Sequence, residues 1–267
     1  MTNLYKQSAK TILNGYWLRA VTVVMVILGV SAFPTILMQI VLALTETDAQ
    51  TPIGLGLLLF ATAVGSLLAS PIMLGFNRIL WLRTAGEKTS LSEVLYLYGN
   101  PKLLFKYLVV YIVKGLLVAV PAGVVIAPSV VISSLSENLA LDAVESVGGP
   151  FAAIMSLGML ALMLIGLSLF ILQAVRYSLI DFAFIKHSDK SVGFILGACS
   201  KLCLKRFKLI VSLYFSFFGW ILLNATGFGR LYTTPYLNAA LASAARQFIA
   251  EDDYNQRIEA EAEAVTV

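Results

Sequence analysis

The sequence predicts an all-α, polytopic membrane protein with six transmembrane helices and two short cytoplasmic interfacial helices. Its 267 residues are 59% hydrophobic and only 13% charged, whereas soluble domains carry roughly a quarter charged residues. Apolar runs of roughly twenty residues, the length that crosses a bilayer, recur along the whole chain. Because backbone groups in lipid must pair within each segment, we expect these runs to be helices.

The first two predicted spans cover residues 20–44 and 53–76. Tyr16 and Trp17 stand at the start of the first, where amphipathic rings prefer the membrane interface. The second contains Gly54, Gly56 and Gly65, and small residues of this kind let helices approach closely. We therefore expect the second span to allow close approach of another helix.

The third predicted span, 103–132, contains Lys114, and the fourth, 151–175, is uncharged. The fourth helix can also continue to residue 185. At 1.5 Å per residue the longer helix exceeds a bilayer core of about 30 Å. It would then either protrude from the membrane or turn.

The fifth and sixth predicted spans, 207–223 and 234–249, flank a turn in which Gly227 and Gly229 can take left-handed conformations. Thr234 as N-cap and Pro235 as first-turn proline predict the start of the sixth. We expect the acidic tail, 251–267, to be a frayed helix or disordered in the cytoplasm.

Two short helices are predicted between spans, at residues 90–98 and 192–202. In the first, four apolar side chains fall at the i, i+3, i+4 and i+7 positions of one face: Leu91, Val94, Leu95 and Tyr98.

The spans form a single predicted domain, residues 1–250. Its segments 53–132 and 151–223 share the order span, Arg, polar turn, short helix, Lys, span. They are either parallel repeats related by an axis along the membrane normal or two ordinary basic loops between spans.

The basic residues predict the orientation. All but two of the 19 Lys and Arg lie on the side that holds both termini; the exceptions are Lys114 and Arg230. The positive-inside rule places that side in the cytoplasm. We expect its basic loops to contact the anionic headgroups of membrane lipids, and we expect no nucleic-acid partner.

Two groups of residues are candidates for function. A polar cytoplasmic mouth is predicted from the set Arg78, Lys114, Arg176, Tyr177 and Asp181. The alternatives are ordinary span ends and, for Lys114, a side chain that snorkels to the surface. Arg230 and Tyr236 form a candidate anion contact at the outer turn, or plain interfacial anchors.

Standard catalytic chemistry is not indicated by the sequence. The single His, His187, lies in a polar loop, and one His with two Cys are too few for a metal site. We therefore expect no catalytic residues, no metal and no cofactor.

Several short segments resemble a family of bacterial integral membrane proteins known as domain of unknown function 975. They are Arg176-Tyr177-Ser178-Leu179, Ser200-Lys201, the run from Leu213 to Trp220, Gly227-Phe228-Gly229 and Pro235-Tyr236. The resemblance covers residues 75–241. It implies a multi-pass protein of the bacterial cell membrane, distantly similar to the membrane domains of glycerophosphodiester phosphodiesterases. The family has no settled activity, so the resemblance implies no catalytic residues.

Three functions follow as hypotheses. The first is a non-enzymatic module that binds lipids, a protein partner or a second copy of itself. The second is a small permease or exporter with a site between spans 2 to 5, and the third is an intramembrane enzyme that acts on lipid. Short loops and interfacial helices beside basic clusters favour the first.

Overall fold

The computed structural model describes residues 2–138, 149–224 and 227–265, with side chains for residues 2–128, 154, 156–224 and 227–254. Every regular element in these ranges is a helix, as the sequence predicted. The chain divides into two compact units, Met1–Tyr111 with Leu179–Val267 and Ile112–Ser178.

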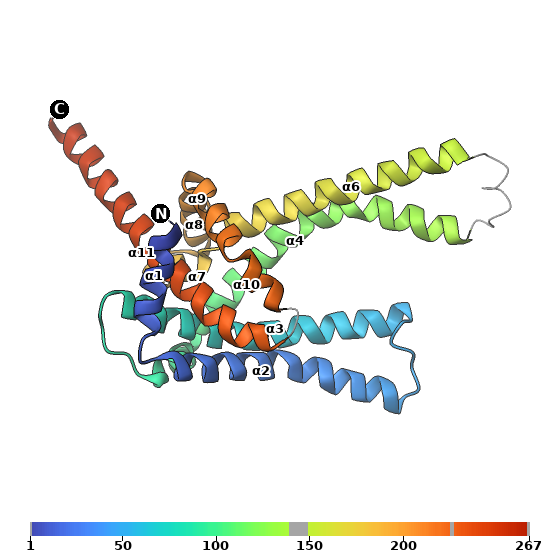
Figure 1. Cartoon of the computed structure of the whole chain (residues 1–267), viewed down its shortest axis with the longest axis horizontal. Helices are drawn as coiled ribbons and strands as arrows, with labels where there is room; N and C mark the ends of the chain where they lie inside the picture. Colours follow the sequence, from blue (N-terminus) through green and yellow to red (C-terminus); the bar gives the residue numbers. More distant parts are fainter. Residues whose placement is uncertain (1, 139–148, 225–226, 266–267) are drawn as a thin grey trace. The chain divides into compact units, whose positions relative to one another are not determined.

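The first unit holds most of the elements (Figure 1). They are α1 (Thr2–Leu13), α2 (Trp17–Leu44), α3 (Pro52–Thr84), the 3₁₀ helix η1 (Leu91–Gly99), the start of α4 (Pro101–Asn138), α7 (Ile180–Lys186), α8 (Val192–Lys205), α9 (Phe207–Ser216), α10 (Phe218–Leu223) and α11 (Phe228–Val265). The second unit holds the rest of α4 and α6 (Gly149–Arg176).

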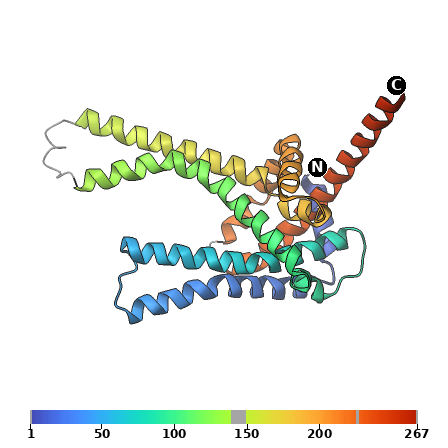
Figure 2. The ribbon, with the colours of Figure 1, turned by 180° about the vertical axis from the view of Figure 1, so that it is seen from behind.

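Helices α2 and α3 run side by side in opposite directions (Figures 1 and 2). They approach closely at Gly65, where an added Cβ would lie 2.0 Å from the backbone oxygen of Ser31. Of the three predicted packing glycines, only Gly65 serves this crossing. A Cβ added at Gly54 would meet the backbone of Asp48 in the preceding loop, and one added at Gly56 would meet nothing within 4 Å.

In the second unit, α4 and α6 also lie side by side (Figure 2). Gly166 of α6 packs against Ile126 of α4, whose side chain would clash with any Cβ at that position. Apolar side chains such as Leu157, Leu164 and Ile171 are exposed on α6. Such a surface suits lipid, because exposed apolar area is costly in water but not against acyl chains.

Helix α1 packs on α11 in the first unit. Alanines at 239, 240, 242, 244 and 245 of α11 are all buried, and so are Tyr5, Ala9 and Ile12 of α1. The small alanine side chains let α1 come close, and the ring of Tyr5 meets that of Phe248 edge-on, with centroids 6.2 Å apart.

Helices α1 and α11 form what we call the helical layer, and cationic side chains fix it to neighbouring helices. Each donates to a carbonyl at a helix end, where carbonyls lack partners within their own helix. Lys6 Nζ donates to the Ser216 carbonyl, where α9 ends. Arg83 donates from Nε to the Ile12 carbonyl at 2.8 Å, and Arg246 donates to the Trp81 carbonyl at 3.2 Å. The layer is therefore fixed to the ends of α3 and α9.

Four stretches of the described chain are long and apolar enough to cross a membrane: Trp17–Leu44, Pro52–Thr84, Pro101–Pro128 and Ser156–Lys186. They correspond to the first four predicted spans. The polytopic membrane fold is confirmed, and the number six stays a prediction.

The fifth predicted span is not one helix. It breaks at Phe217 into α9 and α10. The break is stabilised locally, because the Phe217 ring is fully buried and the freed Ser216 carbonyl accepts from Lys6.

The sixth predicted span begins earlier than expected, at Phe228, so Thr234 is not an N-cap and Pro235 lies inside α11. Gly227 has the predicted left-handed φ, +72°. Gly229 does not have a left-handed φ. A glycine is required there because a Cβ would lie 2.0 Å from the Leu223 carbonyl oxygen. Helix α11 also continues through the predicted tail to residue 265.

One further local expectation was wrong. The segment after α3 forms a 3₁₀ helix, so the buried side chains are Val94 and Leu97, three apart, while Leu91, Leu95 and Tyr98 are exposed. The tight approach of Val94 to Gly75 of α3 selects this face.

Of the two alternatives expected for an extended fourth span, the structure has the turn: residues 177–179 separate α6 from α7. The parallel repeat of 53–132 and 151–223 stays a prediction.

Candidate functional site

Arg78, the first residue of the predicted polar mouth, anchors η1 to α3. Its Nε donates to Glu93 at 2.9 Å, and its guanidinium lies 4.2 Å from the centroid of the Tyr96 ring. Burial raises the pKa of Tyr96, although Arg78 opposes the shift. The described contacts of Arg78 are thus structural.

Asp181, itself half-buried, forms a polar trio with two buried side chains and so joins α3, α4 and α7. Its carboxylate accepts from Asn77 Nδ2 at 2.7 Å and from the Tyr107 hydroxyl at 3.1 Å. Asn77 is 2% exposed and Tyr107 1%, and Asn77 Oδ1 has no hydrogen-bond partner in the structure. The sequence analysis missed both partners, although an amide within an apolar span is itself a signal.

Lys114, Arg176 and Tyr177 belong to the second unit, whereas Arg78 and Asp181 belong to the first. Within the second unit the Arg176 guanidinium lies 5.6 Å from the centroid of the buried Tyr177 ring, and Lys114 is half-buried. The polar mouth therefore stays a prediction.

Tyr236, one of the two outer-turn candidates, holds α1 in place. Its hydroxyl donates to the Lys6 carbonyl at 3.3 Å, and its ring packs edge-on against Phe217, with centroids 5.0 Å apart. Arg230 is exposed near the start of α11. No contact that the structure describes joins these two side chains.

A pocket of about 760 Å³ lies where α1 leads into α2, beside α10 and α11. We call it the α1–α11 pocket. Its lining residues are Lys10, Thr11, Leu13, Asn14, Gly15, Trp17, Trp220, Tyr232 and Tyr236. Three of the rings contact one another in series. Trp17 meets Tyr232 edge-on with ring centroids 4.5 Å apart, and Tyr232 stacks on Trp220 with centroids 5.2 Å apart.

Three ion pairs join basic residues of α7, α8 and the start of α9 to an acidic triplet on α11. The triplet is Glu251, Asp252 and Asp253. Lys186 pairs with Asp253, Lys205 with Asp252 at 2.9 Å, and Arg206 with Glu251. All six side chains are partly exposed. Lys205 and Arg206, expected to face lipid headgroups, are therefore already paired within the protein.

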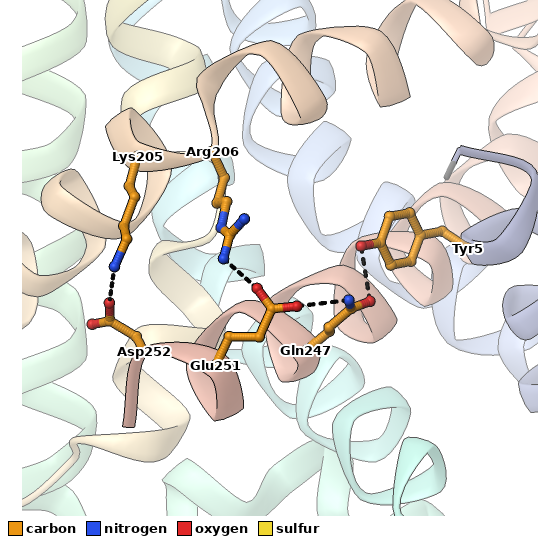
Figure 3. Close-up of polar contacts among 6 residues, drawn as sticks. All are labelled: Tyr5, Lys205, Arg206, Gln247, Glu251 and Asp252. Atoms are coloured by element: carbon orange, nitrogen blue, oxygen red, sulfur yellow. Dashed lines mark hydrogen bonds and ion pairs between the residues drawn. The ribbon is translucent and has the colours of Figure 1, made fainter. Parts of the chain in front are cut away.

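The acidic triplet also connects to α1 (Figure 3). Glu251 accepts from Gln247 Nε2 at 2.8 Å, and Gln247 Oε1 accepts from the Tyr5 hydroxyl at 2.9 Å. Burial, and then the charge of Glu251, raise the pKa of Tyr5. Tyr5 thus remains a hydrogen-bond donor at neutral pH, and the chain Tyr5–Gln247–Glu251–Arg206 links α1 to the start of α9.

A smaller pocket of about 410 Å³ lies between α7, α8 and α11, with His187, Phe194, Lys201 and Asp252 among its lining residues. Burial, and then the neighbouring charge of Lys186, lower the pKa of His187. The imidazole is therefore neutral at pH 7. Its wall holds one ammonium, Lys201, and two carboxylates, Asp252 and Asp253, each of which already pairs with a lysine, so this pocket has no clear preference for ligand charge.

Neutralising the acidic triplet as E251Q/D252N/D253N is expected to destabilise the protein in dilute salt. Exposed ion pairs contribute about 0.2–1 kcal/mol each, so three together contribute about 1–2 kcal/mol. Thermal unfolding in detergent checks this, and the deficit should shrink as salt is raised. D189N, which removes an exposed pair within one loop, is the control. Equal unfolding of the triplet variant and the wild type in dilute salt would contradict the prediction.

The fold and these sites define an all-α polytopic membrane protein that carries a helical layer with a pocket. The family profile described as "Protein of unknown function (DUF975)" matches residues 2–244. The chain belongs to this family, as the resemblance predicted, and the match extends over α1 and α2 as well. It includes the α1–α11 pocket and ends before the acidic triplet. No curated protein and no solved structure matches the chain.

Proposed function

We propose that this protein is a non-enzymatic membrane module that binds anionic lipids at its cytoplasmic face. In this proposal the protein lies in a bacterial cell membrane with both termini in the cytoplasm. An even number of spans, four or six, leaves the termini on one side, and the basic residues of that side favour the cytoplasm.

One observation carries the proposal. Basic residues of the first unit gather on and beside the helical layer, which is held at the end of α3. Arg83 ties α1 to α3, and Arg246 ties α11 to α3. Lys10 of the helical layer is exposed, and so are Lys201 of α8 and Lys208 of α9. Each cation near an anionic membrane surface contributes about 1 kcal/mol of attraction.

The test is the composition of lipid that co-purifies with the protein after mild detergent extraction. We expect anionic phospholipid to be enriched over its share of the source membrane, measured by quantitative lipid mass spectrometry. An unrelated membrane protein of similar size and lower basic charge, purified alongside, is the control. A bound-lipid composition equal to that of the bulk membrane would contradict the proposal.

A second candidate function, a small permease or exporter, is favoured by the Asn77–Tyr107–Asp181 trio, in which two buried side chains hold a half-buried carboxylate. A carboxylate held among buried polar groups at the end of a span is costly, and such groups commonly mark ion or proton pathways. Transport assays in proteoliposomes with the D181N variant test this function. Uptake or export that depends on Asp181 would favour it over lipid binding alone.

A further inference from the structure

We propose that the α1–α11 pocket binds the headgroup of an anionic phospholipid, with Lys10 contacting the phosphate and the Trp17–Tyr232–Trp220 stack contacting the glycerol ester region. This inference rests on the proposed lipid-binding function and assigns it to one site.

The charge of the pocket favours an anion. Lys10 is the one charged residue in its lining, which holds no carboxylate. Lys10 is exposed and takes part in no ion pair among the described residues. Its ammonium can therefore form charge-assisted hydrogen bonds with a phosphate oxygen. Asn14, also in the lining, supplies a second donor beside it.

The aromatic wall fits the part of a lipid that joins headgroup to chains. Trp17 is the first residue of α2, the first helix able to cross a membrane, so the wall lies at the level of the headgroups. Trp and Tyr rings prefer this level because they combine an apolar body with a polar tip. Tyr232, in the middle of the stack, is 45% exposed and thus accessible to a ligand.

Next to the aromatic wall, α11 exposes an apolar ring. Phe228 lies one helical turn before Tyr232, on the same face of α11, and is 84% exposed. A lysine at α1 and an exposed phenylalanine beside the wall match the polar and apolar ends of a phospholipid. The volume, about 760 Å³, lies in the range of small-molecule sites and is sufficient for a headgroup with its glycerol.

The same phosphate chemistry is offered by a soluble phosphate ester. The exposed ring of Phe228 favours the lipid, because a soluble ester would leave that ring uncovered. The experiment therefore includes glycerol 3-phosphate as a separate arm.

The chain contains 3 Trp, of which Trp81 lies outside the pocket. In a W81F background, fluorescence therefore reports on Trp17 and Trp220 alone. Delipidated full-length W81F protein in detergent is titrated with phosphatidylglycerol or phosphatidylcholine carrying bromine near the glycerol end of the acyl chains. We expect the anionic lipid to quench at a roughly tenfold lower concentration, the effect of about one charge-assisted contact.

In W81F/K10Q this tenfold preference should disappear, whereas in W81F/K190Q, which removes an exposed lysine outside the pocket that pairs with its neighbour Asp189, it should persist. Equal loss in both variants, or in neither, overturns the assignment to this pocket. Displacement of the brominated lipid by glycerol 3-phosphate at similar concentration overturns the lipid as ligand. Circular dichroism and thermal unfolding confirm that the variants are folded.

The two proposals fail separately. If anionic lipid is enriched on the purified protein but the Lys10 variant quenches like wild type, lipid binding stands and this pocket is wrong. If neither enrichment nor preferential quenching is found, both are wrong.

Discussion

Replacing Gly65 by Ala is expected to destabilise the protein by about 1–3 kcal/mol, the usual cost of overpacking a tight contact. The added Cβ would lie 2.0 Å from the Ser31 carbonyl oxygen and 3.4 Å from Pro34 Cδ. The nearest obstacle is backbone of α2, which cannot rotate away as a side chain can. The two helices must therefore separate and lose contact along their length. Thermal unfolding in detergent measures the loss, as a midpoint lower by several degrees.

Gly56→Ala is the matched control for this prediction. Gly56 lies on the same helix, and an added Cβ there meets nothing within 4 Å. Since Ala favours helix over Gly by up to about 1 kcal/mol, this variant should be as stable as the wild type or slightly more so. If Gly65→Ala and Gly56→Ala unfolded alike, the α2–α3 crossing would not lie at Gly65.

Asp181→Ala is expected to destabilise the protein by about 2–5 kcal/mol. The substitution leaves the Asn77 amide and the Tyr107 hydroxyl without an acceptor. Both residues are almost fully buried, and each unsatisfied buried group costs about 1–3 kcal/mol. A truncated side chain adds a small cavity. Chemical or thermal unfolding of the purified protein in detergent measures this loss.

Asp181→Asn and Asp189→Ala separate the causes. Asn at 181 keeps an acceptor oxygen, so it should lose less stability than Ala. Asp189 is exposed and pairs only with neighbouring Lys190, so its removal should leave unfolding unchanged. A loss for Asp181→Ala no larger than that for Asp189→Ala would show that the trio does not hold α3, α4 and α7 together.

The sequence predicted the long membrane helices because their signal is local. A run of apolar residues long enough to cross a bilayer is sufficient to define α2 and α3 and to place Trp17 at the start of a span. Family membership was likewise predicted from short segments between Arg176 and Tyr236, and the match to residues 2–244 confirmed it.

The same local signals failed where a neighbouring element decides the conformation. A period of 3.6 placed Leu91, Val94, Leu95 and Tyr98 on one face, yet the segment, which packs against Gly75, is a 3₁₀ helix that buries Val94 and Leu97. Nothing in the sequence distinguishes Gly54, Gly56 and Gly65 as packing residues of α3. Only the contact with α2 distinguishes Gly65 from Gly56.

Candidate site residues were predicted only in part. A charged residue inside or beside an apolar run, such as Asp181 or Arg78, is visible in the sequence. Its partner is not: Tyr107 lies 74 residues from Asp181, and Gln247 lies 242 residues from Tyr5. The α1–α11 pocket combines Lys10 and Trp17 with Trp220 and Tyr232, and no spacing in the sequence indicates that these residues meet.

The sequence by itself determined the solvent of this protein, its helical class and its family. The first two depend on composition within single segments, and the family was indicated by short local motifs. Only the tertiary structure decided that Lys205 and Arg206 pair with the acidic triplet and that four aromatic rings and one lysine line a common pocket. These features depend on which segments meet, and helix packing selects those by shape and by the partnering of buried polar groups, neither of which a local pattern records.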